Sequence, residues 1–324
     1  MEQYEPTQPK LNSIMPAVKD AVHNTYKEKF ESCLKVGADL EPVSVHVMDG
    51  VDYIDGVINA SECSALRSEC DNCKDLKFWS LAGRNDESAR SFRDADTVEV
   101  KSTLLAGIIW ERMRRLLSCP MISISDDEDD VNWERELVGD WEATSLNYDL
   151  LFAKYPSGGA FAPHTDGRAI HNFNTRSFSS VIFFLNDIPE GDGGGTKFYK
   201  AEATKNLQLQ QSNAGMAGAN RWTADDSLVL GTVSAVSGRM LIFHQALVHE
   251  GVPPASPQSK YIIRSDIMYT RRPGICTQPK DIEAYLIFKE AEDLAESGQV
   301  DKAIPLFRRA FKMSPDLARV MGQG

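Results

Sequence analysis

The sequence predicts an α+β protein that is mainly β, with helical segments on both sides of a β-rich centre. Residues 101–117 and the segment after Pro273 show helical periodicity. Between Asn147 and Arg272, short apolar runs alternate with clusters of Gly, Pro, Asn and Asp, a pattern typical of strands and turns. Regularly spaced short strands of this kind predict a sandwich or barrel.

Composition limits the class of protein. The chain has 324 residues, enough for one large domain or two, and its 42% hydrophobic and 25% charged residues are typical of a soluble globular protein. No apolar run of ~18 residues predicts a membrane helix. The formal net charge of −12 argues against a nucleic-acid partner, which requires a basic face. The N-terminus lacks a secretory pattern, so we expect a cytoplasmic or nuclear protein.

The N-terminal elements follow from capping and periodicity. Residues 1–40 predict a helical extension with one helix at about 15–35, and residues 43–58 alternate as one or two strands would. Ser61 is the predicted N-cap of the next helix. A second helix at 101–117 carries an apolar stripe of Leu104, Leu105, Ile108, Ile109, Met113 and Leu116.

Two polar segments are predicted to be loops. Ser125–Asp130 is acidic and is expected to form a solvated turn. Ala201–Asp226 is polar, lacks periodicity and is predicted to be a long loop inserted in the β-rich region. The sequence leaves open whether this loop is a lid over a site or only surface.

Residues 273–324 predict a helical hairpin that resembles one tetratricopeptide unit. Gly298 is placed for the turn between the helices, and Pro315 is expected to end the second helix. The matching positions are Ala291, Leu294, Gly298, Ala303, Phe307, Ala310 and Pro315. A single unit needs a neighbour to bury its faces, and the sequence leaves open whether that neighbour is the barrel, a second copy or a protein partner.

The motif that carries chemistry is His164-Thr165-Asp166. Residues i and i+2 of a strand point the same way, so His164 and Asp166 can bind one metal ion, and a third ligand must come from elsewhere. His244 or His249, from a later apolar strand, would complete a 2-His-1-carboxylate triad. This triad leaves metal positions open and is typical of non-haem Fe(II) oxygenases.

Five segments in order carry a family resemblance. Together they resemble the 2-oxoglutarate/Fe(II)-dependent dioxygenase superfamily and, within it, the prolyl 4-hydroxylase-like branch. They are YPSGGAFAPHTDG (Tyr155–Gly167), VIFFLND (Val181–Asp187), GDGGGTKF (Gly191–Phe198), GRMLIFHQALVHEGVPP (Gly238–Pro254) and KYIIRSDIMY (Lys260–Tyr269). FRDADTVEV (Phe92–Val100) resembles the helical support region of these enzymes. The resemblance implies a double-stranded β-helix, a jelly-roll or cupin-like barrel.

The resemblance also implies a domain division. The dioxygenase domain spans residues 41–272, with helical support at 41–146 and the barrel core at 147–272.

The resemblance favours His249 as the third ligand, because it precedes Glu-Gly as the distal histidine of these enzymes does. A cation on the following strand would bind the distal carboxylate of 2-oxoglutarate. Lys260 lies eleven residues after His249 but sixteen after His244. Arg264 faces the same side of that strand and is the alternative anchor. Tyr155 matches a tyrosine that contacts 2-oxoglutarate, although it could equally be a core aromatic.

The implied function is hydroxylation of a substrate with Fe(II), 2-oxoglutarate and O2, with release of succinate and CO2 and with ascorbate as reductant. A peptidyl-prolyl residue is the first expected substrate, and a free amino acid or small metabolite is the alternative. A barrel that has lost its chemistry and serves as a binding or scaffold module is a second alternative. A cupin-type enzyme using zinc or manganese is a third.

Overall fold

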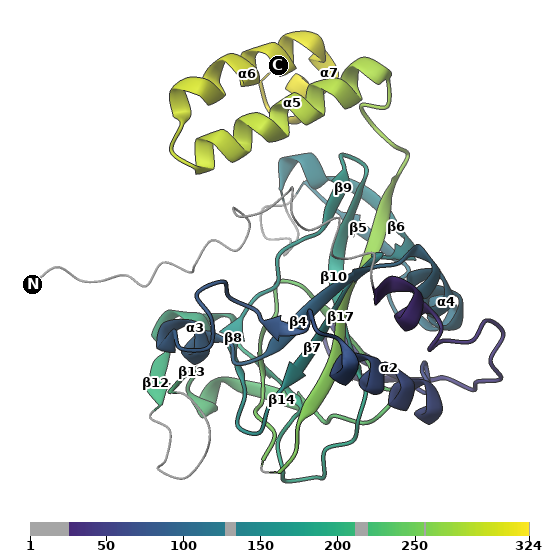
Figure 1. Ribbon diagram of the computed structural model, residues 1–324. Helices are drawn as coiled ribbons and strands as arrows, with labels where there is room; N and C mark the ends of the chain where they lie inside the picture. Colours follow the sequence, from purple (N-terminus) through teal and green to yellow (C-terminus); the bar gives the residue numbers. More distant parts are fainter. Residues whose placement is uncertain (1–25, 127–133, 211–219, 256, 324) are drawn as a thin grey trace, which may run out of the picture.

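The computed structural model describes residues 26–126, 134–210, 220–255 and 257–323. Two antiparallel β-sheets form the centre, helices cover one outer face, and three further helices stand together at one end, drawn in yellow in Figure 1. The α+β, mainly β class is therefore confirmed. None of the helices in the described ranges is long and apolar enough to cross a membrane.

The larger sheet has eleven strands, with the order β1-β2-β15-β10-β17-β7-β4-β3 and with β5, β6 and β9 attached beside this path. Its longest strands, β10 and β17, are neighbours at its centre and pair antiparallel. The strands are β1 (Val43–Met48), β2 (Val51–Asp55), β3 (Lys77–Phe78), β4 (Asp96–Lys101), β5 (Met121–Ile124), β6 (Gly139–Leu146), β7 (Asp149–Tyr155), β9 (Ile170–Asn172), β10 (Thr175–Phe184), β15 (Met240–His244) and β17 (Lys260–Arg272).

The smaller sheet has the order β14-β11-β16-β8 and packs on the larger one. Its strands are β8 (Phe161–His164), β11 (Thr196–Tyr199), β14 (Val229–Val233) and β16 (Val248–Gly251). A buried cluster that includes Phe184, Phe198 and Phe243 fills the space between the sheets. Two antiparallel sheets closed over one core are the jelly-roll arrangement that the sequence predicts.

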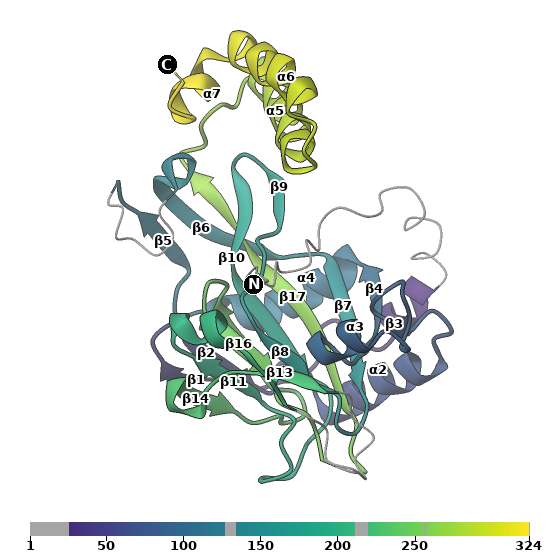
Figure 2. The same ribbon diagram turned by 90° about the vertical axis from the view of Figure 1, so that its left-hand side faces the viewer.

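The outer face of the larger sheet is covered by helices, as Figure 2 shows for α2 and α4 beside β7 and β17. The helices are α2 (Ala60–Asn72), α3 (Glu87–Phe92) and α4 (Thr103–Met113), and residues 26–31 are also helical. Leu66 of α2 and Ile109 of α4 are fully buried and join Phe152 and Phe183 of the sheet in one apolar core. This burial, and not local propensity, fixes the helices on the sheet.

Three predictions about this region need correction. The N-cap of α2 is Asn59 and not Ser61, because Asn59 and Glu62 form a reciprocal capping box. Residues 96–101 form strand β4 and are not helical. Strands β5 and β6 also lie within residues 41–146, the range predicted to be helical support. The N-terminal helix ends at residue 31, and the part of its predicted range before residue 26 lies outside the described residues.

The region predicted as a long loop contains regular structure. A short hairpin joins β12 (Gln208–Gln210) to β13 (Arg221–Thr223), and 3-10 turns lie at Ala201–Asn206 and Asp226–Leu228. Ala203 and Ala224 are buried in a small apolar cluster with Tyr199 and Val248. This cluster ties both ends of the segment to the smaller sheet. Residues 211–219, and most of the acidic segment predicted to be a turn, lie outside the described residues.

The C-terminal helices are α5 (Pro279–Glu296), α6 (Val300–Met313) and α7 (Pro315–Val320). The predicted hairpin is present, with Gly298 at its turn at φ +80°, but Pro315 also begins a third short helix, whose N-cap is Ser314. Phe173, in the loop between β9 and β10, packs on Tyr285 of α5 with ring centroids 5.0 Å apart. The tetratricopeptide likeness and a partner or dimer contact through this hairpin stay predictions.

Candidate metal centre

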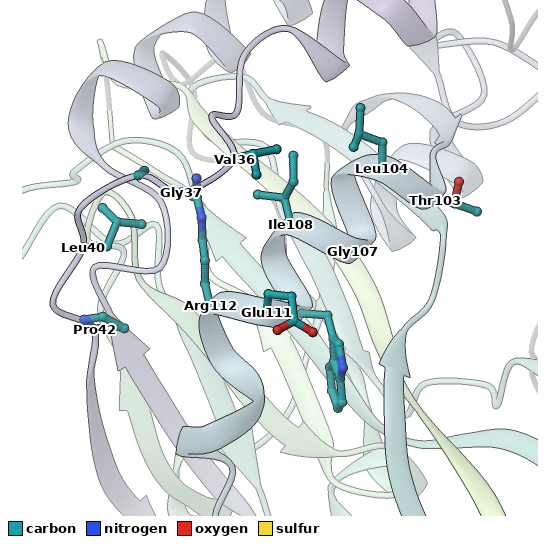
Figure 3. A pocket seen from close by; sticks show the side chains of 12 residues that line it. Val36, Gly37, Leu40, Pro42, Thr103, Leu104, Gly107, Ile108, Glu111 and Arg112 are labelled. Carbon is teal, nitrogen blue, oxygen red and sulfur yellow. The ribbon is translucent and has the colours of Figure 1, made fainter.

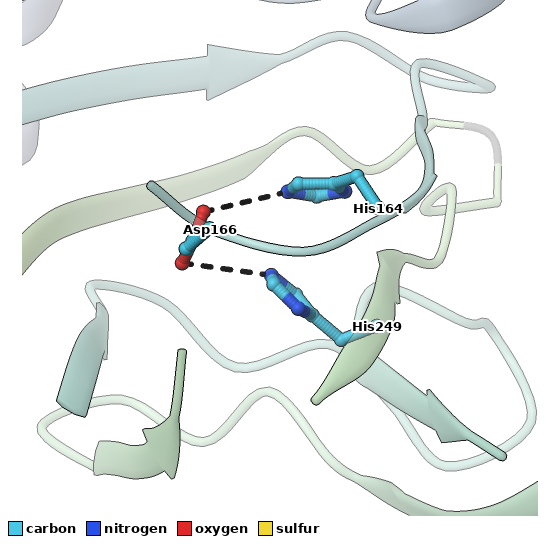
Figure 4. A group of neighbouring side chains, drawn as sticks. All are labelled: His164, Asp166 and His249. Atoms are coloured by element: carbon cyan, nitrogen blue, oxygen red, sulfur yellow. Dashed lines mark ion pairs between the residues drawn. The ribbon is translucent and has the colours of Figure 1, made fainter. Parts of the chain in front are cut away.

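Two histidines meet across the smaller sheet. His164 ends β8, and His249 lies opposite it on β16, so the backbone register brings the two rings to a centroid distance of 4.3 Å. Asp166 follows β8 in a loop, where its backbone N–H donates to the Gln245 carbonyl over 3.0 Å. One potential ligand atom from each of these three residues lies within 4.8 Å of the other two (Figure 4).

Backbone carbonyls fix the orientation of both imidazoles. His164 Nδ1 lies 2.7 Å from the Ala162 carbonyl oxygen, and His249 Nδ1 lies 3.0 Å from that of Leu247. Each Nδ1 therefore carries the proton, and each Nε2 is left as a lone-pair donor. The Nε2 atoms lie 3.6 Å and 3.8 Å from the Asp166 carboxylate oxygens. Two imidazole nitrogens and one carboxylate match the donor set of a non-haem Fe(II) site.

Aromatic packing keeps the histidines away from water. The Phe161 ring stacks on His164 at 3.7 Å between centroids, and Phe243 lies 4.4 Å from His249. Burial, with the neighbouring His164 adding to it, lowers the pKa of His249 to about 4. His249 is therefore neutral at ordinary pH, which is the form that binds metals.

The carboxylate is ionised. Burial alone would raise the pKa of Asp166, but the positive charge of Arg264, together with the contacts of His249 and His164, outweighs burial and holds this pKa well below its usual range. Ser180 Oγ donates to Asp166 Oδ2 over 2.6 Å, and an Arg264 guanidinium nitrogen lies 3.5 Å from the same oxygen. These two contacts orient the carboxylate toward the histidines.

Arg264 is occupied by carboxylates of the protein itself. Besides Asp166, its guanidinium pairs with Asp266 over 3.0 Å. Asp266 is buried and also accepts hydrogen bonds from Asn147 and Gln245 over 3.1 Å and 2.9 Å. The arginine is thus one member of a closed polar network beside the candidate ligands.

Lys260, unlike Arg264, forms no ion pair with a carboxylate of the described residues. It is 2% exposed, and its ammonium donates one hydrogen bond, over 3.3 Å to the Val252 carbonyl. Within the described part of the chain no carboxylate lies at ion-pair distance from it, and the ammonium lies 4.7 Å from the centre of the Tyr155 ring. Burial lowers its pKa to about 7, with Arg93 adding to this effect and Glu250 opposing it. Such a buried cation lacks a counter-ion and suits an anionic ligand.

The structure brings some of the predicted site residues together and places others apart. His164, Asp166 and His249 come together, and Lys260 lies beside Tyr155, with its ammonium 4.7 Å from the centre of that ring. His244 ends β15, opposite Ser179 of β10, and is not part of the three-residue cluster.

Sequence reasoning missed Ser180, which directly precedes the quoted segment Val181–Asp187. It also missed the role of Arg93, whose only signal was its place in the Phe-Arg-Asp motif.

A separate groove of about 670 Å³ lies on the outer side of α4 (Figure 3). Its lining includes Val36, Leu40, Leu104 and Ile108 and none of the candidate metal ligands. The residues that line this groove do not suggest a catalytic or metal-binding site.

Comparisons with known proteins agree with this site. The sequence profile of the phytanoyl-CoA dioxygenase family (PhyH) matches residues 48–262, more than half of the chain. No curated protein matches the chain.

Three solved structures are examples of those that match the chain. The viral collagen prolyl hydroxylase of Paramecium bursaria Chlorella virus-1 with 2-oxoglutarate is 15% identical, with a TM-score of 0.39, and the match covers 69% of this chain and 99% of that one. A Pseudomonas putida prolyl-4-hydroxylase is 15% identical, with a TM-score of 0.38, and the match covers 69% of this chain and 93% of that one. HygX from Streptomyces hygroscopicus with nickel and 2-oxoglutarate is 12% identical, with a TM-score of 0.38, and the match covers 68% of this chain and 83% of that one.

The fold and the His-Asp-His cluster define a member of the 2-oxoglutarate/Fe(II)-dependent dioxygenase superfamily. Within it, the chain belongs to the phytanoyl-CoA dioxygenase family. The superfamily prediction is confirmed, and the prolyl 4-hydroxylase-like branch stays a prediction.

Proposed function

We propose that this protein hydroxylates a substrate with Fe(II), 2-oxoglutarate and O2, and that His164, Asp166 and His249 bind the metal. The supporting observation is the cluster of three donor atoms within 4.8 Å, with both Nε2 atoms turned toward the carboxylate. When bound, Fe(II) supplies the oxidation chemistry in which 2-oxoglutarate is decarboxylated to succinate and CO2. The residues of the chain bind, orient and shield the reactants.

Lys260 is the proposed anchor for the distal carboxylate of 2-oxoglutarate. Its ammonium is buried and lacks an ion pair with any described residue, whereas Arg264 already pairs with Asp166 and Asp266. A carboxylate beside Lys260 would gain a charge-assisted hydrogen bond in a site that excludes water.

Two neighbours lie close to the ammonium of this lysine. Gly251 leaves it room, because a Cβ there would lie 3.4 Å from the Lys260 ammonium. Tyr155 forms one wall through the ring that faces the ammonium.

A peptidyl-prolyl residue is the first proposed substrate. Its support is the resemblance of the ordered motifs around His164 and His249 to the prolyl 4-hydroxylase-like branch, together with the helical hairpin at 273–324, which suits a protein partner. A free amino acid or small metabolite is the second candidate. A non-catalytic scaffold is disfavoured by the complete and oriented cluster.

The test is product analysis by mass spectrometry. The purified protein is incubated with Fe(II), 2-oxoglutarate, ascorbate and O2 in the presence of a proline-rich peptide pool or a small-molecule extract. A peptide that gains one oxygen atom on proline with the parent protein, and not with His164→Ala, supports the prolyl assignment. Oxygenation confined to small molecules would overturn that substrate and keep the reaction class.

A further inference from the structure

A second buried cation lies beside the candidate metal centre. Arg93 directly follows α3 and is 8% exposed, and its backbone forms an isolated bridge with Phe161 of β8. Its guanidinium lies over the Phe161 ring at 4.7 Å and near the Tyr155 ring at 5.9 Å. Its Nε is buried without a hydrogen-bond partner, and no residue in the described ranges accepts a hydrogen bond from this guanidinium or forms an ion pair with it.

The nearby carboxylates are already paired with other cations. Asp94, the next residue, bonds to Arg84 and lies 3.3 Å from Arg90. Glu250, which acts on the neighbouring Lys260, lies 3.8 Å from Lys197. Arg93 therefore remains a buried charge without compensation, an arrangement that costs free energy unless a ligand supplies the counter-charge.

The position of Arg93 connects it to the reaction site. The Phe161 ring, on which the guanidinium lies, stacks on the candidate ligand His164 at 3.7 Å. The Tyr155 ring is shared, because Lys260 lies 4.7 Å from it and Arg93 lies 5.9 Å from it. Two cations thus lie beside the same aromatic ring. A single 2-oxoglutarate has one distal carboxylate, and Lys260 accounts for it.

We propose that Arg93 binds a carboxylate of the primary substrate, so that this enzyme selects acidic substrates. The inference rests on the proposed function and deepens it. A guanidinium presents two parallel N–H donors to a carboxylate, and the rings of Phe161 and Tyr155 hold its plane in place. The carboxylate can belong to a free acid or to a peptide, through an acidic side chain or the C-terminus.

Binding of acid and amide probes tests this assignment. The protein is loaded with Mn(II) and saturated with 2-oxoglutarate, and it is titrated in a calorimeter with L-proline and L-prolinamide. A second pair is the blocked dipeptides prolyl-glutamate amide and prolyl-glutamine amide. We expect the acid of at least one pair to bind about tenfold or more tightly than its neutral partner. A preference for the acid in the first pair means that the carboxylate belongs to a free acid. A preference in the second pair means that it belongs to a peptide.

Two substitutions of Arg93 test whether this residue causes the preference for the acid. Arg93→Gln should abolish the preference for the acid without weakening the binding of 2-oxoglutarate, whereas Arg93→Lys should retain part of the preference. Equal binding of acids and amides by the parent protein would overturn the proposal. A loss of 2-oxoglutarate affinity in Arg93→Gln as large as in Lys260→Met would also overturn it, because Arg93 would then serve the cosubstrate.

Failure of the proposed function gives a different result. If the parent protein binds neither Mn(II) nor 2-oxoglutarate, the dioxygenase assignment is wrong. The same titrations on the metal-free protein then still decide whether Arg93 binds a carboxylate.

Discussion

His164 and His249 face each other across the ladder between β8 and β16, with ring centroids 4.3 Å apart. Both side chains are therefore fixed by the backbone of a sheet, and each ring is fixed again by a carbonyl two residues before it. Only Asp166 comes from a loop, and Ser180 and Arg264 hold that carboxylate in place. The cluster is arranged for metal binding before any ion arrives.

Removing one histidine should remove the metal. His164→Ala leaves two protein ligands, so we expect the affinity for Fe(II) to fall by at least about 100-fold, more than the loss of an outer-shell partner usually costs. Iron content after dialysis and a metal titration measure this. His171→Gln is the matched control, because His171 is exposed on β9 and lies outside the cluster. Equal iron content in His164→Ala and the control would contradict the ligand assignment.

Arg264 should act on the metal site by positioning Asp166. Arg264→Gln leaves Asp266 buried without its cation, and we expect a loss of about 2–3 kcal/mol in unfolding free energy, less than for a fully buried pair because the arginine side chain is 28% exposed. Metal affinity should also fall about 10–100-fold. Urea denaturation and calorimetry measure the two effects.

A second substitution separates these effects. The double variant Arg264→Gln/Asp266→Asn removes the uncompensated charge and should recover most of the stability, but not the metal affinity. Recovery of both would show that Arg264 only balances charge.

Lys260 predicts a pH dependence of 2-oxoglutarate binding. Burial lowers the pKa of this lysine to about 7 in the unliganded protein, and only the protonated form attracts a carboxylate. The dissociation constant should therefore be lowest below about pH 7 and should rise with pH, by up to about tenfold per pH unit. Calorimetric titration of the Mn(II)-loaded protein checks this. Lys260→Arg stays charged and should remove the slope, and an unchanged slope in that variant would exclude Lys260 as its source.

The same lysine affects stability with a definite sign. Its pKa is lower in the folded protein than its ordinary value of 10.5, so the unfolded chain binds more protons between the two values. Its contribution therefore destabilises the fold most below pH 7 and diminishes as pH rises. Lys260→Met should raise the melting temperature most at acid pH, even though it removes 2-oxoglutarate binding. A melting temperature lowered at every pH would contradict the uncompensated burial of this charge.

Two glycines near the site offer a stability test. A Cβ on Gly193 would lie 2.2 Å from the Pro253 carbonyl oxygen, whereas one on Gly191 would meet nothing within 4 Å, and both residues have positive φ. Gly191→Ala should cost about 1–2 kcal/mol for the backbone conformation alone. Gly193→Ala should cost about 1–3 kcal/mol more, because the chain after β16 must move. Equal costs in urea denaturation would mean that the contact with Pro253 relaxes freely.

The sequence predicted which three residues the fold brings together more accurately than it predicted the helices and strands around them. The spacing of His164 and Asp166, and the order of the later motifs, were sufficient to propose the three residues that the structure brings together. Lys260 and Arg264 could not be told apart, because they lie four residues apart on one face of a strand. The structure separates them by their partners, because Arg264 pairs with Asp166 and Asp266, which only the tertiary structure brings close.

The errors in the fold also have physical causes. Asn59 and Ser61 are both good N-caps, and the reciprocal bond between Asn59 and Glu62 decides between them. The alternation in residues 96–101 is that of a strand, but the segment was assigned to the helical support. The place of Arg93 in the Phe-Arg-Asp motif does not reveal its uncompensated burial, because that depends on which carboxylates the fold pairs with other cations.

The most direct test of the metal centre is succinate formation by the purified protein with 2-oxoglutarate and O2, with and without Fe(II), alongside His249→Ala. We predict succinate that requires Fe(II), with a rate that rises when a suitable substrate is added, and none from the variant. Succinate formed by His249→Ala at the parent rate, or none from a parent protein shown to contain iron, would contradict the assignment of His164, Asp166 and His249 as the iron site of a dioxygenase.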